Sequence, residues 1–170
     1  LLKDMYNNGI TKIVSAGYSL EGTKRNIELA KKYNFIYTTA GISPNDLSDK
    51  FEKDIQEIEQ LLVANLQSGK ILAIGEIGLD YHYDTDKKIQ YEAFRKQIDI
   101  ANKYNLPIVI HTRDAVMDTI TLLKENKVKE KGIFHCCPLN RELVKEALKL
   151  DFYISMAGPI TFKNSKNANE

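Results

Sequence analysis

Three side chains that can bind a metal ion each follow a short apolar run in this chain. Glu76 follows ILAIG, His111 follows LPIVI and His135 follows GIF. If these runs are neighbouring parallel strands, their carboxyl ends meet at one rim, where ligands and chemistry collect in α/β folds. One carboxylate and two imidazoles at such a rim predict a metal site.

This set of ligands favours hydrolysis. A glutamate with two histidines suits zinc, manganese or iron, and it suits magnesium if carboxylates or water from elsewhere complete the shell. A water bound to such a cation is a nucleophile near neutral pH, and the cation can polarise a phosphoryl oxygen. Taken singly, Glu76 could pair with a lysine or arginine, and each histidine could be a hydrogen-bonded core residue. Their equivalent places at three strand ends favour a shared site.

Arg113 is the candidate for binding substrate. It lies two residues beyond His111 and therefore on the same side of an extended chain, where its guanidinium could grip a phosphate bidentately. The alternative is an ordinary salt bridge at the rim with Asp114 or Asp118.

A polar cluster follows Glu76 in the sequence. Asp80, His82 and Asp84 alternate with other residues in GLDYHYD. They could orient the metal ligands or contact substrate, or they could form a solvated loop.

The elements that must position these residues alternate between strand and helix. Six apolar runs bounded by Gly, Pro, Asn or Asp predict buried strands: ITKIVSAG, FIYTTAG, ILAIG, LPIVI, GIF and FYISMAG. Helical spacing of apolar residues predicts helices over 23–33, 51–66, 89–104, 115–125 and 141–150, the last capped by Asn140. This alternation predicts a parallel sheet with right-handed crossovers.

Two closures of such a sheet are possible, an open doubly wound sheet and a barrel. Six strands are two short of an eight-stranded TIM (β/α)8 barrel, which typically takes about 250 residues. The length and composition predict that residues 1–170 are a single domain, and the start at Leu1 and the stop in a polar segment predict that both ends are cut. We expect that domain to be the internal portion of a TIM-barrel hydrolase, with about six of its eight βα units.

Composition limits the cellular location and the kinds of partner that this chain can have. The 170 residues are 43% hydrophobic and 28% charged, with a formal net charge of +1. No broad basic face is predicted, so any nucleic-acid contact must come from a local site. The two cysteines are adjacent, and neither a signal peptide nor a membrane span is apparent in the sequence. We therefore expect a cytoplasmic protein that does not engage a membrane.

Four segments in this order and spacing resemble the TatD family of metal-dependent deoxyribonucleases. They are GEIGLDYHYD, QYEAFRKQIDIANKYNLPIVIHTRDA, GIFHC and GPITFKN. The resemblance implies a TIM-barrel hydrolase that uses one or two divalent ions to cleave phosphodiester bonds in DNA. It also implies that Glu76 bridges two ions and that His111 and His135 complete the shell of the second.

The chain also departs from the family pattern. The HxHxD motif of the first strand and the aspartate of the last strand, which would complete the first metal site, do not occur in these 170 residues. Ser43 in GISP replaces a histidine expected near the substrate phosphate, and CPLN replaces the FSG that usually follows GIFHC. We expect both to alter substrate grip or turn geometry without removing a metal ligand.

The sequence thus predicts a divalent-metal-dependent DNase with Glu76 as catalytic residue and metal ligand, His111 and His135 as further ligands, and Arg113 on the phosphate. We expect one or two divalent ions, magnesium, manganese or zinc, with DNA as the partner, and no obligate protein partner is inferred. Two alternatives remain: an amidohydrolase-type enzyme acting on a small amide or ester, and a non-catalytic truncated copy.

Overall fold

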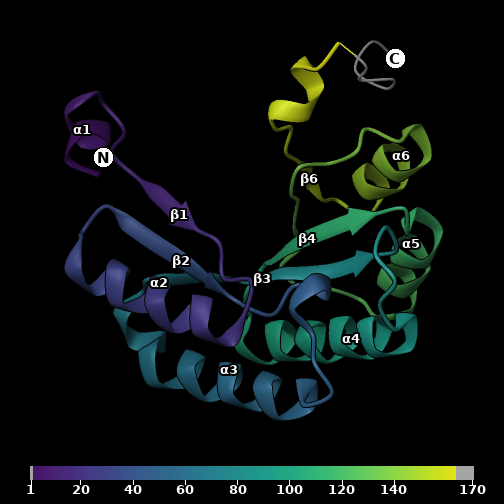
Figure 1. The fold of residues 1–170 in the computed structure, drawn as a ribbon, viewed down its shortest axis with the longest axis horizontal. Helices are drawn as coiled ribbons and strands as arrows, with labels where there is room; N and C mark the ends of the chain where they lie inside the picture. Colours follow the sequence, from purple (N-terminus) through teal and green to yellow (C-terminus); the bar gives the residue numbers. More distant parts are fainter. Residues whose placement is uncertain (1, 164–170) are drawn as a thin grey trace.

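The computed structural model describes residues 2–163 as one six-stranded parallel sheet with helices between the strands (Figure 1). The strands are β1 (Ile13–Ser15), β2 (Ile36–Ala40), β3 (Ile71–Asp80), β4 (Ile108–Arg113), β5 (Gly132–Phe134) and β6 (Tyr153–Ile154). The α-helices are α1 (Leu2–Asn7), α2 (Leu20–Lys32), α3 (Phe51–Asn65), α4 (Lys87–Tyr104), α5 (Val116–Glu125) and α6 (Arg141–Lys149). Short 3-10 turns occur at η1 (Pro44–Asp46), η2 (Leu66–Ser68) and η3 (Gly158–Thr161).

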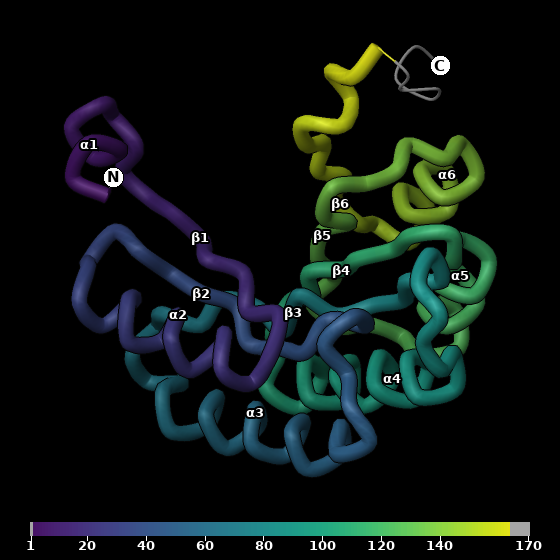
Figure 2. The backbone as a smooth tube through the Cα atoms, viewed as in Figure 1, coloured from purple at the N-terminus to yellow at the C-terminus, as the bar shows by residue number. Residues whose placement is uncertain are grey.

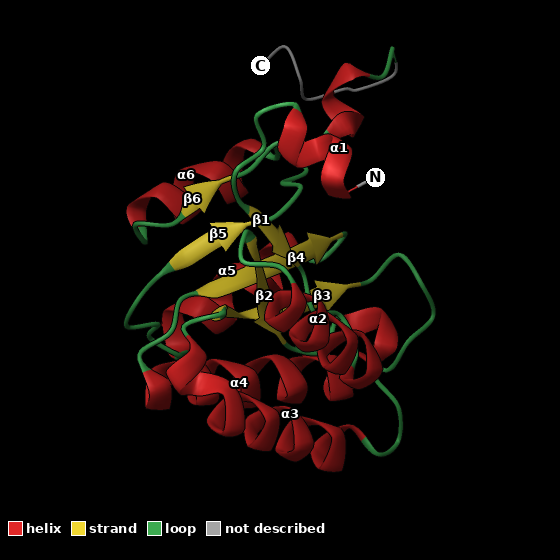
Figure 3. Cartoon of the chain, turned by 90° about the vertical axis from the view of Figure 1, so that its left-hand side faces the viewer, coloured by secondary structure: helices red, strands yellow, loops and turns green. Residues whose placement is uncertain are grey.

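The sheet is curled, and its strands follow one another in sequence order from β1 to β6. Helices α2 to α6 lie on its convex side, whereas α1 and η3 extend away on the other side (Figures 1 and 3). The tube in Figure 2 traces the same arch from α1 to η3. An open doubly wound sheet carries helices on both faces, so the barrel closure is the correct one of the two predicted. Among the described residues, the chain forms five βα units and a sixth strand of a barrel of the TIM type.

Local sequence explains most helix boundaries. The Ser19 hydroxyl accepts from the amide of Gly22 at the start of α2, and the Asp86 carboxylate accepts from the first amides of α4. The predicted cap at Asn140 is confirmed, because its side chain accepts from the amides of Glu142 and Leu143. Helix α1 was not predicted. Within residues 2–163, none of the helices is both long enough and apolar enough to cross a membrane.

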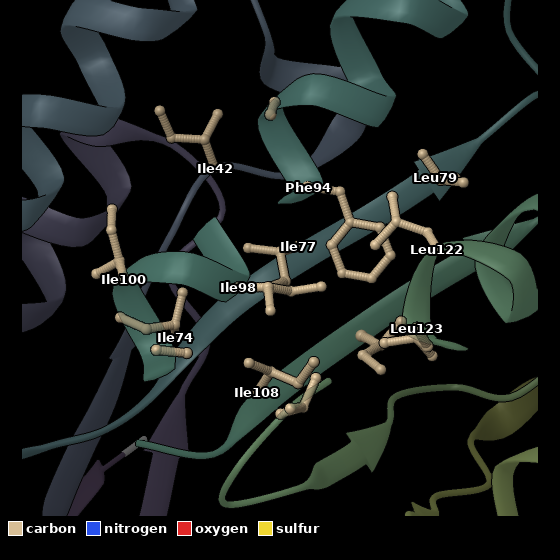
Figure 4. Close-up of a cluster of buried hydrophobic side chains, with 14 of the residues drawn as sticks. Ile42, Ile74, Ile77, Leu79, Phe94, Ile98, Ile100, Ile108, Leu122 and Leu123 are labelled. Carbon is tan, nitrogen blue, oxygen red and sulfur yellow. The ribbon is translucent and has the colours of Figure 1, made fainter. Parts of the chain in front are cut away.

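The main hydrophobic core lies between the sheet and the helices. Its fully buried members come from both layers (Figure 4): Ile74, Ile77 and Leu79 of β3, Phe94 and Ile98 of α4, Ile108 of β4 and Leu122 of α5. The isoleucines and leucines on β3 and β4 therefore fix which side of each strand faces the helices. The opposite side of each strand is left for the concave face.

One prediction about the strands needs correction. The sequence placed Glu76 and His111 just after their strands, but both lie inside them, because β3 runs on to Asp80 and β4 to Arg113. The extension follows from pairing: Gly78, Leu79 and Asp80 lie opposite His111, Thr112 and Arg113 in a continuous parallel ladder. The apolar residues Ile77 and Leu79 pack on the core in this extension, which keeps it part of the sheet.

Candidate metal and substrate site

A local irregularity in β3 turns Glu76 toward the concave face. The pairing with β4 shifts register between Ile74 and Ile77, and both isoleucines are fully buried in the core. Strict alternation would place residues three apart on opposite faces, so an additional residue between them is accommodated as a bulge. The Glu76 side chain, next to Ile77, thereby points away from the helices, and it keeps 18% of its surface exposed.

Regular alternation in β4 brings His111 to the same face. Ile110 before it is fully buried in the core, and the Thr112 hydroxyl after it meets the Thr119 hydroxyl of α5 at 3.0 Å. His111 between them therefore faces the concave side, where its Nδ1 lies 3.1 Å from Oε1 of Glu76. The structure thus brings two of the three predicted metal ligands together.

Asp80 holds the other nitrogen of the same ring. Its Oδ2 lies 2.9 Å from Nε2 of His111, and its side chain is only 1% exposed. The carboxylate also accepts from Nδ2 of Asn45 at 2.9 Å and from the backbone amide of His82 at 3.0 Å. Of the polar cluster after Glu76, Asp80 is therefore the member that orients a predicted ligand.

The close approach of β3 and β4 at this point requires glycine. Gly78 lies opposite His111 in the ladder and has a φ of +146°. A Cβ atom there would collide with the backbone carbonyl oxygen of His111. The glycine of GEIGLD therefore lets the two strands carry Glu76, Asp80 and His111 at contact distance.

The pKa values of the three groups follow from these contacts. The pKa of Glu76 lies below its ordinary value, mainly because His111 donates to it; burial opposes the shift, and the charges of His111 and His135 assist it. Burial lowers the pKa of His111, but acceptance by Glu76 and Asp80 outweighs burial and raises it. Burial raises the pKa of Asp80, and hydrogen bonds from Asn45, His111 and the amide of His82 more than reverse this.

The Glu76 and His111 pair fits a metal ion. Two ligand atoms on one zinc or magnesium ion stand roughly 3.0–3.5 Å apart, and Glu76 Oε1 and His111 Nδ1 are 3.1 Å apart. With Nε2–H donated to Asp80, a neutral His111 directs the lone pair of Nδ1 at the carboxylate, an arrangement that needs a proton or a cation between the two atoms. A carboxylate behind a ligating histidine is the usual support of such a site.

His135 stands apart from this pair. It follows the buried Phe134, and its side chain is exposed on the concave side, where it lines a hollow of about 600 Å³. Every strand borders that hollow, through Val14, Thr39, Leu72, Val109, Ile133 and Tyr153. Among residues 2–163, no three His, Cys, Asp or Glu side chains are close enough together to hold an ion. The predicted role of His135 as a ligand stays a prediction.

Arg113 lies beside His111 at the rim. Both residues border a second hollow of about 470 Å³, together with Cys136, Leu139 and Ile160. The alternative salt bridge is not formed: Asp114 approaches His82 at 3.3 Å, and Asp118 accepts from the Tyr81 hydroxyl at 2.7 Å.

The guanidinium of Arg113 instead lies over the Tyr83 ring, with 5.7 Å between Cζ and the ring centroid. Within the described part of the chain, no acidic side chain forms a salt bridge with Arg113, and its side chain is exposed. The guanidinium therefore keeps its charge available to an anion at the rim.

The two departures from the family pattern have local structural roles. Ser43 is buried, and its hydroxyl donates to Oδ2 of Asp46 at 3.0 Å, within the turn that also carries Asn45. Cys136, just before the CPLN segment, and Leu139 within it take positive φ values of 47° and 55°, which turn the chain from β5 to the Asn140 cap.

Comparison with known proteins identifies the family. The chain matches the family described as TatD related DNase over residues 1–170. It belongs to the TatD family. It is 42% identical over 163 residues to "Uncharacterized metal-dependent hydrolase YabD" of Bacillus subtilis, covering 95% of this chain and 62% of that protein. It is 34% identical over 145 residues to "Uncharacterized metal-dependent hydrolase YcfH" of Escherichia coli, covering 84% and 52%.

A solved structure shares the fold. The crystal structure of the TatD homolog YJJV from Escherichia coli superimposes with a TM-score of 0.85 at 25% identity, covering 95% of this chain and 62% of that one. The chain thus spans about half to two thirds of the length of these relatives. The resemblance seen in the sequence and the barrel fold are confirmed.

Proposed function

We propose that this TatD-family chain forms part of a divalent-metal-dependent hydrolase that cleaves phosphodiester bonds in DNA. The observation that carries the proposal is the contact between Glu76 and His111 at 3.1 Å, with Asp80 fixed behind the histidine at 2.9 Å. Two carboxylates on opposite sides of one imidazole are typical of a supported metal ligand. The names of YabD and YcfH as metal-dependent hydrolases support the same class of chemistry.

Glu76 and His111 would hold the ion, and we assign His135 to the same ion or to a second one. The carboxylate of Glu76 is kept ionised by its lowered pKa, so it is available as a ligand at neutral pH. The bound ion would supply a Lewis acid for the phosphoryl oxygen and an acidified water as nucleophile. Asp80 keeps the proton of His111 on Nε2 and so leaves Nδ1 free to ligate.

Phosphodiester specificity rests on Arg113. It lies at the rim beside His111 with no carboxylate partner among the described residues, whereas a site for neutral amides or esters has no need of an unpaired guanidinium. A planar guanidinium matches two phosphate oxygens at once. The family description as TatD related DNase supports DNA as the substrate.

The wider setting is also proposed. We assign residues 1–170 to the internal portion of a longer barrel, in which further strands would add ligands to Glu76 and His111. The number and identity of the ions and the cytoplasmic location expected from the sequence stay predictions.

Cleavage of a labelled single-stranded oligonucleotide by the protein of the complete reading frame tests this function. The reactions contain EDTA, magnesium, manganese or zinc, and Glu76→Ala is compared with Glu92→Ala, an exposed glutamate on α4. We expect metal-dependent cleavage that Glu76→Ala abolishes and Glu92→Ala preserves. Full activity in Glu76→Ala contradicts the assignment of the site.

The alternatives give other outcomes in the same assay. Turnover of small esters or amides without oligonucleotide cleavage indicates an amidohydrolase-type enzyme. A folded protein that takes up no metal and turns over none of these substrates indicates a non-catalytic copy.

A further inference from the structure

Two buried glutamines on α4 form paired hydrogen bonds with the main chain of single residues. Gln90 accepts from the amide of Asp80 at 2.8 Å and donates to the carbonyl of Asp80 at 2.8 Å. Gln97 accepts from the amide of Ile42 at 2.8 Å and donates to its carbonyl at 3.1 Å. Each carboxamide thus pairs with a backbone residue as a neighbouring strand would, and both side chains are only 1% exposed.

The two backbone segments held in this way both contribute to the support of His111. Asp80 ends β3 and contacts Nε2 of His111 through its carboxylate. Ile42 begins the turn that carries Asn45, and Asn45 donates to the same carboxylate at 2.9 Å. Helix α4 therefore anchors both backbone segments from which the support of His111 is built.

This arrangement is more specific than core packing requires. Gln90 and Gln97 are seven residues apart and share the face of α4 that carries the buried Ala93 and Phe94. Apolar side chains would satisfy packing there, but they would leave the buried amide and carbonyl of Asp80 without partners. The Gln90 carboxamide also donates to the Thr85 hydroxyl, so the same side chain holds the loop after β3.

We propose that Gln90 is a positioning residue for the metal site: its carboxamide fixes the backbone of Asp80, and Asp80 sets the orientation and the protonated nitrogen of His111. Gln97 supports this role by holding the turn that supplies Asn45. The inference rests on the proposed function, because it assumes that Nδ1 of His111 ligates an ion. It adds to that function a residue on the convex side of the sheet that controls metal affinity without contacting the metal.

Mn²⁺ affinity of the complete protein, measured by isothermal titration calorimetry, is the test. Supporting partners of metal ligands typically change metal affinity by about 10–100-fold. We expect Gln90→Met to weaken Mn²⁺ binding about tenfold. Gln90→Glu keeps an oxygen that accepts from the amide of Asp80, and its protonated form can also donate to the carbonyl, so we expect a smaller loss than from Gln90→Met.

A double-mutant cycle separates positioning from general destabilisation. In an Asp80→Asn background the carboxylate that accepts from Nε2 of His111 is already absent. Gln90→Met should therefore weaken Mn²⁺ binding less than about twofold in that background. Leu62→Ala, a buried α3 residue in the same core, is the control for lost stability and should leave the Mn²⁺ affinity of the folded protein unchanged.

Two results would overturn the inference. One is unchanged Mn²⁺ affinity in both Gln90 variants, and the other is an equal loss from Gln90→Met in the wild-type and Asp80→Asn backgrounds. Either can occur while the wild-type protein binds Mn²⁺ and cleaves DNA, and then the proposed function stands. A wild-type protein that binds no Mn²⁺ contradicts the proposed function and this inference together.

Discussion

The Asp80 carboxylate lies 2.9 Å from Nε2 of His111, on the far side of the ring from Glu76, which lies 3.1 Å from Nδ1. The imidazole therefore lies between two carboxylates that differ in exposure: Asp80 is buried, whereas Glu76 is partly exposed on the concave face. The buried carboxylate of Asp80 can only orient the ring, whereas the exposed carboxylate of Glu76 can bind an ion together with His111. This asymmetry gives the two acids separate roles.

Asp80→Asn should weaken metal binding without removing a ligand. The amide can donate to Nε2, which would move the ring proton to Nδ1 and block the lone pair that faces Glu76. We expect metal affinity to fall about 10–100-fold, with the fold retained. Calorimetric titration with Mn²⁺ measures the change, and Asp84→Asn, at an exposed acid of the loop after β3, is the control. Equal affinities in the two variants would refute the role assigned to Asp80.

Stability of the metal-free protein should depend on pH through the same three groups. The raised pKa of His111 contributes stability that is complete below the ordinary histidine value of about 6.5 and is lost as pH rises through the folded value. The lowered pKa values of Glu76 and Asp80 contribute stability that is present above about 4 and lost as pH falls. In EDTA, Tm should therefore be highest between about pH 4.5 and 6.5.

A metal ion should shift this optimum upward, because it competes with the proton on Nδ1 of His111. Thermal melts from pH 4 to 9, with EDTA or with Mn²⁺, measure the difference. The His111→Gln variant should flatten the alkaline side of the EDTA curve. A slope that persists unchanged in this variant would assign the pH dependence to another group.

Gly78→Ala should destabilise the fold more than another positive-φ glycine does. A Cβ at Gly78 meets the carbonyl of His111, whereas Gly69, with a φ of +63°, has open space around it. We expect Gly69→Ala to cost roughly 1–2 kcal/mol from backbone strain alone, and Gly78→Ala to cost clearly more because β3 and β4 must separate. Urea denaturation compares the two variants, and similar losses would mean that the close approach is not required.

The parts of this architecture that depend on local sequence were predictable. Strand and helix alternation follows from apolar spacing, and the Asn140 cap follows from one residue's chemistry. The bulge before Glu76 was not predictable, because a register shift is defined only against the partner strand. The hydrogen bonds of Gln97 to Ile42 were not predictable either, because they depend on tertiary packing.

The candidate site was also predicted only in part. The sequence named Glu76 and His111 as ligands from their places beside apolar runs, and the fold brings them into contact. It placed Asp80 in a cluster with His82 and Asp84, and only the curled sheet distinguishes the buried acid from its exposed neighbours. Residues that act through contacts across the sheet leave no periodic signal in the chain.

Glu146→Gln should make the protein less stable at neutral pH and less sensitive to acid. Its carboxylate contacts Lys124 of α5 at 2.6 Å and Lys149 at 2.5 Å, and these lysines lower its pKa to about 2. A lowered folded pKa gives stability that is present above about 4.5 and is lost as pH falls toward about 2.

The difference in Tm between wild type and Glu146→Gln should therefore shrink as pH falls below about 4.5. Glu28→Gln breaks a single exposed pair with Lys31 and should change Tm little at any pH. A Tm difference for Glu146→Gln that is constant from pH 2 to 7 would exclude the ion pairs as its cause.

Arg113→Ala should weaken the use of oligonucleotide substrate while leaving the metal site intact. The guanidinium lies beside His111 at the rim and has no carboxylate partner among the described residues, so its loss removes a phosphate contact and leaves no acid unpaired. Hydrogen bonds to charged groups contribute about 1.5–3 kcal/mol, which corresponds to a fall in kcat/KM of roughly 10- to 100-fold. Arg113→Lys should recover only part of this, because an ammonium cannot form the bidentate contact.

Steady-state cleavage and Mn²⁺ titration on the same preparations test this assignment. The matched control is Arg95→Ala, since Arg95 is an arginine on the outer face of α4 whose partner Asp99 lies one turn away at 3.5 Å. If Arg113→Ala weakens Mn²⁺ binding as much as cleavage, then Arg113 supports the metal site and not the substrate. If kcat/KM falls with Mn²⁺ affinity unchanged, and Arg95→Ala has no effect, the guanidinium binds the phosphate that the site cleaves.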